Sequence, residues 1–330
     1  MNKFSWNNLP RPIICLAPMA GYTDSAYRQL VKEIAPGVIC FTEFTSTDGI
    51  KYGSKRTLKQ VGFNPDIERP IIAQIFGKKP ESFAIAAAAL EEMGVDAIDI
   101  NMGCPAKKIV SSDHGSALLK NPDLAAKIVE TTVKATSLPV SIKTRLGTKD
   151  KDAKFLIDYC KRMESAGAQL ITLHGRTAAQ MYTGEADFEL IYEVKKHVKV
   201  PVIGNGDITS IESAKEKLGN LDGLMVGRAT MGNPWIMAEL WHAFHDDTTS
   251  PDYKPYTSPK SFHDRLPTLI RHMELSVETK GENRGVMEMR KYLAASIKGF
   301  PGASEYRQKL VRVETLKEAV TLLKEIDKLS

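Results

Sequence analysis

The sequence predicts a (β/α)8 barrel over residues 1–245, a linker at 246–260 and an all-helical domain at 261–330. Short apolar segments bounded by Gly, Pro or Asn recur eight times, and most are followed by a helical pattern of apolar residues. The C-terminal part is helical throughout. With 330 residues, 42% of them hydrophobic, the chain can form a barrel of about 250 residues and a smaller appended unit.

The eight predicted strands are residues 13–19, 38–44, 70–76, 97–101, 139–144, 169–174, 201–205 and 223–226. Predicted helices between and after them include residues 81–93, 123–135, 151–165, 188–197, 210–218 and 234–244. Regular alternation of this kind suits a closed parallel sheet. An open doubly wound sheet is the competing architecture, but no GxGxxG motif follows the first strand.

The predicted linker is the stretch DDTTSPDYKPYTSPK, which is polar, contains three prolines and shows no periodicity. After it, the helical pattern breaks near Gly281, residues 299–302 and Arg312. Residues 262–330 hold 13 Lys and Arg against 10 Asp and Glu, a net charge of +3. This modest excess fits either a solvated helical surface or a face that binds nucleic acid.

Composition excludes several classes of protein. The four cysteines are scattered, with no CxxC motif or Cys/His cluster, so we expect neither disulfides nor a metal site. The first eleven residues lack the apolar core of a signal peptide, and no run of 18 uncharged apolar residues predicts a membrane span. We therefore expect a cytoplasmic protein. Its net charge of +5 permits a polyanionic partner without requiring one.

The most informative stretch is Asn101-Met102-Gly103-Cys104-Pro105, which ends the fourth predicted strand. Catalytic residues of βα barrels lie at such strand ends, and the Gly and Pro around Cys104 would fix the backbone of the thiol. A free thiol is mostly protonated at neutral pH, so Cys104 can serve as a general acid. A buried cysteine that only fills space is the alternative. The Asn101 amide could bind an amide-like edge such as that of uracil.

Polar residues at the other strand ends predict a phosphate-bearing cofactor. Asn205, Gly206 and Asp207 end the seventh strand, and Gly227 and Arg228 end the eighth, where barrels commonly bind phosphate. Gln74 and Lys143, which we place on strands facing each other across the barrel, could hold a planar heterocycle. A lysine near a flavin pyrimidine ring would stabilise its reduced anionic form, which indicates FMN.

Seven motifs resemble the tRNA-dihydrouridine synthases, and within them the bacterial B-type branch. They are LAPMAGYTD (16–24), QIFG (74–77), DINMGCP (99–105), IKTRLG (142–147), LHGRT (173–177), GNGDI (204–208) and VGRATMGNPW (226–235). Together they extend over most of the chain. The segment KGFPG (298–302) is a shorter similarity to the same branch.

The resemblance implies an enzyme in which NAD(P)H reduces FMN, which then passes hydride to C6 of a uridine flipped out of tRNA. Cys104 would deliver the proton to C5. FMN would be surrounded by Ala17, Pro18, Met19, Gln74, Lys143, His174, Asn205, Gly206, Asp207, Gly227 and Arg228. Asn101, Arg145 and Tyr182 would hold the uracil, although Tyr182 lies in a loop without a strong motif and could be an ordinary loop residue. Position 17 of tRNA is the expected target, and we expect a monomer.

Two other functions compete with this one. An FMN barrel acting on a free pyrimidine, in the manner of dihydroorotate dehydrogenases, would have no evident need of a basic helical domain, whereas a large polyanion would. A non-enzymatic RNA-binding protein would not need the proton donor and the flavin-binding residues. Flavin absorbance of the purified protein would distinguish the RNA-binding protein, which should be colourless, from the two flavoenzymes.

Overall fold

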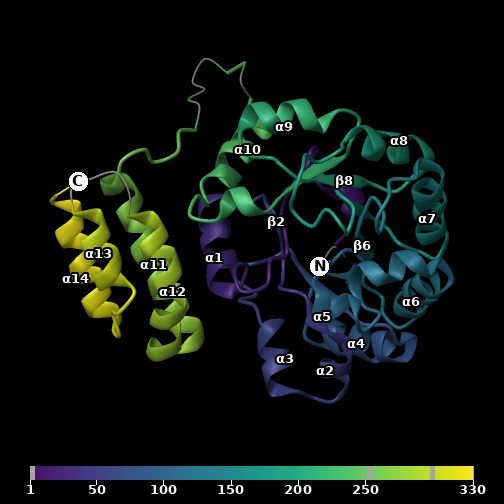
Figure 1. The fold of residues 1–330 in the computed structure, drawn as a ribbon, viewed down its shortest axis with the longest axis horizontal. Coiled ribbons are helices and arrows are strands. Elements are labelled where there is room, and N and C mark those ends of the chain that lie inside the picture. Colours follow the sequence, from purple (N-terminus) through teal and green to yellow (C-terminus); the bar gives the residue numbers. More distant parts are fainter. Residues whose placement is uncertain (1–3, 248, 251–253, 255, 298–301, 330) are drawn as a thin grey trace.

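Eight parallel strands form a closed barrel in the computed structural model, which describes residues 4–247, 249–250, 254, 256–297 and 302–329 (Figure 1). β1 pairs with both β2 and β9, and β2 pairs with β4, so that the hydrogen-bonded ring has no open edge. The barrel strands are β1 (Ile13–Leu16), β2 (Ile39–Phe41), β4 (Ile71–Phe76), β5 (Ala97–Asn101), β6 (Val140–Arg145), β7 (Ile171–His174), β8 (Val202–Asn205) and β9 (Gly223–Val226). The predicted barrel is confirmed.

The first two predicted strands run past the ends of the observed ones. The sequence predicts strand structure to residues 19 and 44, whereas β1 ends at Leu16 and β2 at Phe41. The apolar residues beyond these ends leave the sheet and turn toward a cavity at the end of the barrel. Hydrophobic pattern alone does not separate a sheet residue from an apolar residue that lines a pocket.

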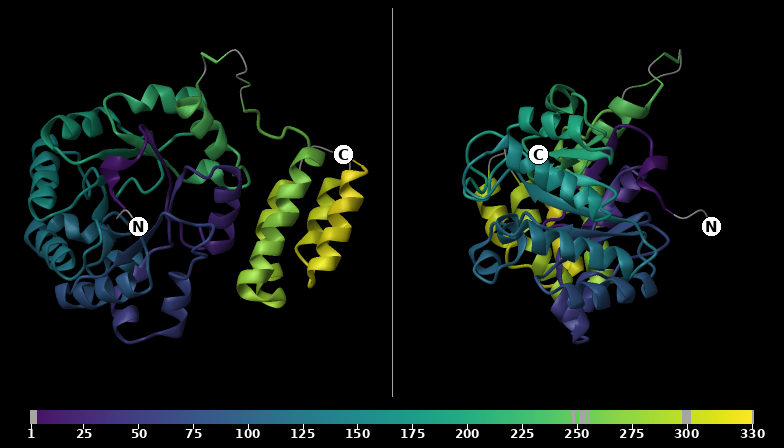
Figure 2. Two further views of the ribbon diagram at one scale, coloured as in Figure 1. Left: turned by 180° about the vertical axis from the view of Figure 1, so that it is seen from behind. Right: turned by 90° about the vertical axis from the view of Figure 1, so that its right-hand side faces the viewer.

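One excursion between β2 and β4 is absent from the predicted pattern. A two-residue strand, β3 (Thr45–Ser46), pairs with the last two residues of β4 and leads into two short helices, α2 (Thr47–Lys51) and α3 (Lys55–Gln60). These helices project beyond the ring of barrel helices, as both views in Figures 1 and 2 show.

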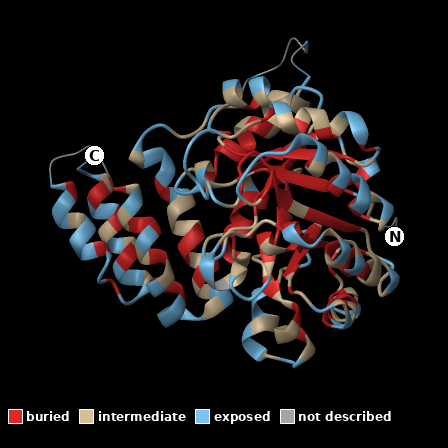
Figure 3. Cartoon of the chain, turned by 45° about the vertical axis from the view of Figure 1, so that its right-hand side comes forward, coloured by how far each residue is buried: buried red, intermediate tan, exposed pale blue. Residues whose placement is uncertain are grey.

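The outer layer of the barrel is a ring of amphipathic helices. Their apolar faces cover the strands, and side chains of both layers form one continuous core (Figure 3). These helices are α1 (Ser25–Ile34), α4 (Pro80–Glu92), α6 (Pro122–Lys134), α7 (Ala153–Ser165), α8 (Glu189–His197), α9 (Ile211–Leu218) and α10 (Ile236–His245). The six predicted barrel helices match six of them within two residues.

Short elements complete the barrel. They are the helix α5 (Lys107–Val110) and the 3₁₀ turns η1 (Trp6–Asn8), η2 (Gly115–Lys120) and η3 (Arg228–Thr230). Trp6 of η1 packs with Ile13 and Ile39, the first residues of β1 and β2, and stacks on Phe41 at a centroid distance of 6.3 Å. Because these strands begin at the amino end of the barrel, η1 closes that end, and the carboxyl end remains for a site.

Four helices form the C-terminal unit: α11 (Phe262–Lys280), α12 (Glu282–Ser296), α13 (Ala303–Leu310) and α14 (Leu316–Asp327). They enclose a core of their own, in which Met273, Leu293 and Leu323 are fully buried. Helix ends lie at the predicted breaks near Gly281 and Arg312, while residues 298–301 of the KGFPG segment lie outside the described part of the chain. The domain boundaries at 245 and 261 remain a prediction; in the structure α10 ends at His245 and α11 begins at Phe262.

The helical unit packs against α1 of the barrel (Figure 1). At this seam the rings of Tyr27, His272 and Tyr292 form a cluster with centroid distances of 4.9 to 6.2 Å. Lys280 forms ion pairs with Asp24 of the barrel and with Glu288 of α12. An apolar centre with ion pairs beside it fixes the docking of the two units.

No helix within the described residues is long and apolar enough to span a membrane.

The seam should make stability depend on pH through His272. Burial lowers the pKa of His272 from 6.5 to about 4, so the folded chain resists a proton that the unfolded chain accepts. Its contribution to stability is complete above pH 6.5 and is lost as the pH falls toward 4, at a cost of about 2 to 3 kcal/mol. His272→Phe should show a smaller loss of urea-unfolding free energy between pH 7 and pH 4.5 than wild type.

The exposed, non-titrating residue Gln308 of α13 provides the control, because Gln308→Ala should keep the wild-type pH dependence. Asp24 does not interfere in this range, since Lys280 holds its pKa below the ordinary value of 3.8 despite its burial. An unchanged pH slope in His272→Phe would contradict this account of the seam.

Candidate functional site

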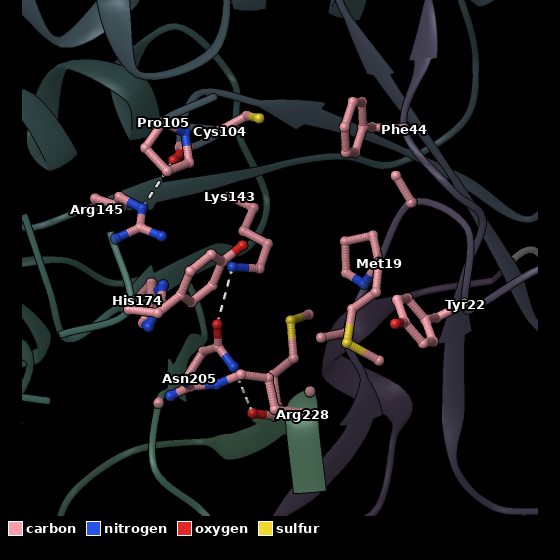
Figure 4. Close-up of a pocket in the computed structure, with 18 of the residues that line it drawn as sticks. Met19, Tyr22, Phe44, Cys104, Pro105, Lys143, Arg145, His174, Asn205 and Arg228 are labelled. Atoms are coloured by element: carbon pink, nitrogen blue, oxygen red, sulfur yellow. Dashed lines mark hydrogen bonds between the residues drawn. The ribbon is translucent and has the colours of Figure 1, made fainter. Parts of the chain in front are cut away.

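A cavity of about 780 Å³ opens at the carboxyl ends of the strands (Figure 4). Such a volume is within the usual range for a small-molecule site. All fifteen site residues predicted from the sequence line it: Ala17, Pro18, Met19, Gln74, Asn101, Cys104, Lys143, Arg145, His174, Tyr182, Asn205, Gly206, Asp207, Gly227 and Arg228. The structure therefore brings the predicted residues together, while the roles assigned to them remain predictions.

Cys104 lies in a tight turn directly after β5. The Oδ1 atom of Asn101 accepts hydrogen bonds from the backbone N–H groups of Gly103, at 3.1 Å, and Cys104, at 2.9 Å. A Cβ at Gly103 would lie 3.2 Å from backbone atoms of Thr144, so only glycine fits this approach to β6 without a shift. The turn holds the thiol at the wall of the cavity.

The thiol is partly buried, and burial raises the pKa of Cys104 above its ordinary value of 9.0. An N–H of Ala106 and the charges of Arg145 and Lys143 act in the opposite direction but do not outweigh burial. Cys104 is thus protonated at neutral pH and able to donate a proton. The other three cysteines are fully buried, and burial raises their pKa values as well.

A buried chain of hydrogen bonds leads from this turn into the barrel interior. The Asn101 amide donates to Gln74 Oε1 at 2.9 Å, and the Gln74 amide donates to Asp99 Oδ2 at 2.7 Å. Asp99 also accepts a hydrogen bond of 2.7 Å from the hydroxyl of Ser141. The Asp99 carboxylate thereby fixes which way both amides point, and through Asn101 it supports the Cys104 turn.

The expectation that Gln74 and Lys143 face each other across the barrel is wrong. Gln74 belongs to β4 and Lys143 to β6, and only β5 separates these two strands. Strand order in a barrel follows the pairing, and the eight-strand ring places β8, not β6, opposite β4. Gln74 and Lys143 therefore line the same side of the cavity.

Lys143 is half-buried in the cavity, where its Nζ donates to Asn205 Oδ1 at 3.0 Å (Figure 4). The Asn205 amide in turn donates to the carbonyl of Met225 at 2.7 Å, which fixes its oxygen toward the lysine. Burial and the nearby Arg145 lower the pKa of Lys143 to about 8. The ammonium is mostly protonated at neutral pH and loses its charge above pH 8.

Arg145 joins two loops at the mouth of the cavity. Its Nε donates to the carbonyl of Gly103 at 2.9 Å, and its Nη1 donates to those of Thr177 and Met181 at 2.9 and 2.8 Å. Its Nη2 has no hydrogen bond to a group within the described residues. Arg145 therefore holds the Cys104 turn against the loop that carries Tyr182 and keeps one donor group for a ligand.

Tyr182 stands over the cavity, and the residue is 54% exposed. The guanidinium groups of Arg228 and Arg145 lie 5.2 and 5.7 Å from its ring centroid. Cation–π contacts of this kind orient an exposed ring, so Tyr182 is held by the site it borders.

Arg176, which the sequence analysis did not select, organises the cation-rich side of the site. The Nη2 of its buried side chain contacts both carboxylate oxygens of Asp207, at 2.6 and 2.8 Å, and donates to the carbonyl of Gly184, while its Nε donates to the carbonyl of Thr183. Arg228 donates to the same Asp207 at 3.1 Å. Asp207 thus fixes both arginines, and its pKa is lowered because they outweigh its partial burial.

Burial and four surrounding cations lower the pKa of His174 to about 2, so this ring is neutral throughout the physiological range. The cations are Lys143, Arg145, Arg176 and Arg228. A Cβ on the neighbouring Gly206 would lie 2.7 Å from Ala186 and 3.2 Å from the His174 ring, and Gly206 has a φ of +129°. Glycine is therefore required where this loop passes the histidine. The resulting pocket attracts anions, and His174 can act only as a neutral hydrogen-bonding group.

Sequence reasoning also missed Tyr22, Phe44 and Asp99. Tyr22 and Phe44 line the cavity, and both lie within or next to segments that the sequence analysis quoted. Asp99 had a visible signal, because a charged residue at the centre of the apolar strand 97–101 must point into a barrel and find partners there. Within the described residues, no group of three or more His, Cys, Asp or Glu side chains could hold a metal ion.

A family profile described as "Dihydrouridine synthase (Dus)" matches residues 15–329. A probable tRNA-dihydrouridine synthase of Rickettsia conorii is 40% identical over 296 residues, which cover 89% of this chain and 87% of that protein. The tRNA-dihydrouridine synthase B of Pseudomonas aeruginosa is 37% identical over 308 residues, covering 93% and 90% of the two chains. A probable tRNA-dihydrouridine synthase 1 of Synechocystis sp. is 39% identical over 310 residues, covering 93% and 84%.

Solved structures show a similar barrel in more distant proteins. An old yellow enzyme homologue from Zymomonas mobilis superposes with a TM-score of 0.51 at 13% identity, covering 71% of this chain and 89% of that chain. Morphinone reductase gives a TM-score of 0.50 at 12% identity, covering 70% and 86%. At these identities the likeness concerns the fold.

The buried Asp99 provides a test of the hydrogen-bond chain. Burial raises the pKa of Asp99 to about 6, so its charge at neutral pH opposes folding rather than favouring it. Asp99→Asn keeps an acceptor for Gln74 and can pair with the Ser141 hydroxyl. We therefore expect its urea-unfolding free energy at pH 7.5 to equal or exceed that of wild type.

Asp99→Ala removes the acceptor and leaves the buried Gln74 amide unsatisfied, which should lower the unfolding free energy by about 1 to 3 kcal/mol. Because Cys104 is the one cysteine that is not fully buried, its alkylation rate by iodoacetamide should rise in Asp99→Ala and stay at the wild-type value in Asp99→Asn. Equal alkylation rates in all three proteins would rule out support of the Cys104 turn by Asp99.

Proposed function

Because the chain belongs to the dihydrouridine synthase (Dus) family, we propose that it reduces a specific uridine of tRNA to 5,6-dihydrouridine, with bound FMN and with NAD(P)H as reductant. The predicted family resemblance is confirmed by the profile match and by relatives that share 35 to 40% of their residues. Similarity to synthases named B agrees with the predicted branch. The single observation that carries the proposal is a protonated thiol in a cavity that is also lined by fixed cations.

The donor set of the cavity fits FMN. The guanidinium of Arg228, held by Asp207, suits a phosphate monoester, as do the loops at Gly206 and Gly227. Lys143 and the amides of Gln74 and Asn205 present donors and acceptors to a heterocycle, with Gln74 and Asn205 on strands at opposite sides of the barrel. Ala17, Pro18, Met19 and the neutral His174 complete the lining.

Bound FMN would accept hydride from NAD(P)H and supply it to C6 of the uracil. The chain provides the proton: Cys104, kept protonated by burial, donates from Sγ to C5 on completion of the reduction. The Asn101 turn keeps that thiol in place, and Arg145 ties the same turn to the loop of Tyr182. Proton delivery from a fixed position avoids dependence on solvent.

Asn101, Arg145 and Tyr182 are proposed to hold the uracil, with one change from the sequence-based expectation. The Asn101 oxygen is already used by two backbone N–H groups, so Asn101 can offer the base only an N–H. The free Nη2 of Arg145 can donate to a uracil carbonyl. Tyr182, held between two arginines, can stack on the base or close over it.

The substrate must enter as an extruded nucleotide, because a stacked uridine cannot reach a thiol inside a barrel. The helical unit, with a net charge of +3 over residues 262–330, would hold the tRNA through phosphate contacts and shape. Position 17 is the uridine that we propose, and NADPH and NADH remain equal candidates. We further propose a monomeric enzyme acting in the cytoplasm, where tRNA is modified.

Replacement of Cys104 tests the proton donor. Cys104→Ala should retain FMN and its reduction by NAD(P)H, since neither needs the thiol, but should form dihydrouridine at least a hundredfold more slowly. The matched control is Cys160→Ala, which removes a buried thiol outside the cavity. Dihydrouridine in tRNA after single-turnover reaction is the measurement, and a normal rate in Cys104→Ala would remove Cys104 from this role.

Replacement of Lys143 and Arg228 tests the cofactor site. Each of Lys143→Ala and Arg228→Ala should weaken FMN binding roughly ten- to a hundredfold, the usual effect of losing a charge-assisted hydrogen bond. Asp207 stays paired with Arg176 in Arg228→Ala, so the loop should keep its structure. Exposed Lys154→Ala is the control, and unchanged FMN dissociation constants in both site variants would overturn the proposed arrangement.

The pKa of Lys143 adds a second measurement on the same proteins. Because this pKa is about 8, the ammonium is lost between pH 7 and pH 9, and FMN affinity of wild type should fall over that range. In Lys143→Ala the decrease should be absent.

A further inference from the structure

The excursion formed by α2 and α3 leaves the barrel at the rim of the cavity. Phe44 lines the cavity, and the next two residues form β3, which pairs with Ile75 and Phe76 at the carboxyl end of β4. α2 begins at the following residue, Thr47. The two helices therefore project from the end of the barrel at which the cavity opens, in a sector next to that of α1 and the helical unit (Figures 1 and 2).

This excursion carries a concentrated positive charge. Residues 47–60 contain Lys51, Lys55, Arg56 and Lys59 against a single carboxylate, Asp48, which gives a net charge of +3 in a chain whose total is +5. Residues 262–330 account for another +3, and the remainder of the chain therefore has a net charge of −1. All of the positive excess lies in these two segments.

The cations of the excursion are free to meet a partner. Lys55, Arg56 and Lys59 are exposed, Lys51 is half-buried, and none of the four forms an ion pair within the described residues. Some other lysines of the barrel, such as Lys134 and Lys195, lie within 2.5 and 2.6 Å of a carboxylate oxygen. Two adjoining short helices thus carry four cations without a carboxylate partner among the described residues.

An exposed aromatic ring accompanies them. Tyr52 is 74% exposed, the highest value among the large hydrophobic side chains that the structure describes. It lies between α2 and α3, it is followed by Gly53 with a φ of +63°, and a Cβ at that glycine would meet nothing within 4 Å. The Nζ of Lys51 lies 5.6 Å from the ring centroid. The ring is thus available to a planar group from solvent.

We infer that the surface made by Lys51, Tyr52, Lys55, Arg56 and Lys59, termed the α2–α3 surface, is a second RNA-binding area, on the barrel itself. It binds backbone phosphates through its cations and stacks an unpaired base on Tyr52. An acidic peptide could satisfy the charges, but the exposed ring and the position beside the cavity favour RNA, because an extruded uridine brings its flanking nucleotides over this rim. The inference rests on the proposed function and adds a part of the binding surface to it.

Charge reversal provides the test, with net charge matched between variants. Lys55→Glu/Arg56→Glu removes two cations from the surface, and Lys154→Glu/Lys161→Glu removes two exposed, unpaired cations from α7. Both change the total charge equally. In full-length, FMN-loaded protein, we expect the first variant to bind unmodified tRNA at least tenfold more weakly at low salt, and the second less than threefold. The slope of log affinity against log salt should shrink by about 1 to 2 in the first variant only.

Tyr52 supplies an independent variant that leaves charge unchanged. Tyr52→Ala should weaken tRNA binding severalfold to a hundredfold, as loss of base stacking does, and Tyr52→Phe should bind like wild type. In all these variants FMN content and its reduction by NAD(P)H should be normal. In Lys55→Glu/Arg56→Glu and in Tyr52→Ala, KM for tRNA should rise, and the single-turnover rate at saturating tRNA should be retained.

The outcomes separate this inference from the proposed function. If the wild-type protein forms dihydrouridine and both charge-reversal variants bind tRNA equally well, the RNA-binding role of the α2–α3 surface is refuted. The proposed function then remains intact. A second outcome is that the wild-type protein forms no dihydrouridine, while tRNA affinity falls only in Lys55→Glu/Arg56→Glu and Tyr52→Ala. That result would support an RNA-binding surface and refute the proposed reaction.

Discussion

Closure of the sheet between β1 and β9 is the constraint on which the rest of the structure depends. Four register pairs join these strands, from Ile13 opposite Gly223 to Leu16 opposite Val226, and the N–H of Ala17 then donates to the carbonyl of Val226 at 2.8 Å. The first and last strands of the barrel thus end side by side. Because all eight strands are parallel, closure brings every carboxyl end to one rim, where Gly227 meets Ala17 and Met19. Residues more than 200 positions apart form a single cavity for this reason.

Charged side chains in and around that cavity lower the free energy of unfolding, and other contacts must compensate for them. Lys143, Arg145 and Arg176 are charged groups with little exposure, and their mutual repulsion, like their burial, opposes folding. The chain compensates with fixed acceptors: Asn205 for Lys143, three backbone carbonyls for Arg145, and Asp207 with two carbonyls for Arg176. Buried cations that remain after such compensation prepare a site for an anion, which would relieve the repulsion. A site of this kind gains stability when its ligand binds.

The helical unit is connected to the cavity by direct contact. Tyr22 lines the cavity, and its ring packs edge-on against Tyr292 of α12 at 5.8 Å, while the Tyr292 hydroxyl donates to the carbonyl of Tyr22. Lys291 lies over the Tyr22 ring at 4.3 Å and donates to the carbonyl of Gly21. The wall of the cavity is therefore partly held by residues of the C-terminal unit.

The sequence by itself determined the barrel, its strand order in the chain, the helical C-terminal part and fifteen of the residues that line the cavity. Apolar periodicity predicts the elements, and a parallel barrel brings the polar residues after every strand to one rim. Six of the fifteen were expected from the family resemblance alone: Ala17, Pro18, Met19, Arg145, His174 and Tyr182. Only the tertiary structure decided which partners these residues have. Strand pairing places Gln74 on the same side as Lys143. Hydrogen bonds commit the oxygen of Asn101 to the Cys104 turn, pair Arg176 with Asp207, and join Asp99 to Gln74. Such contacts form only when the closed barrel brings distant segments together, so the spacing of residues along the chain does not predict them.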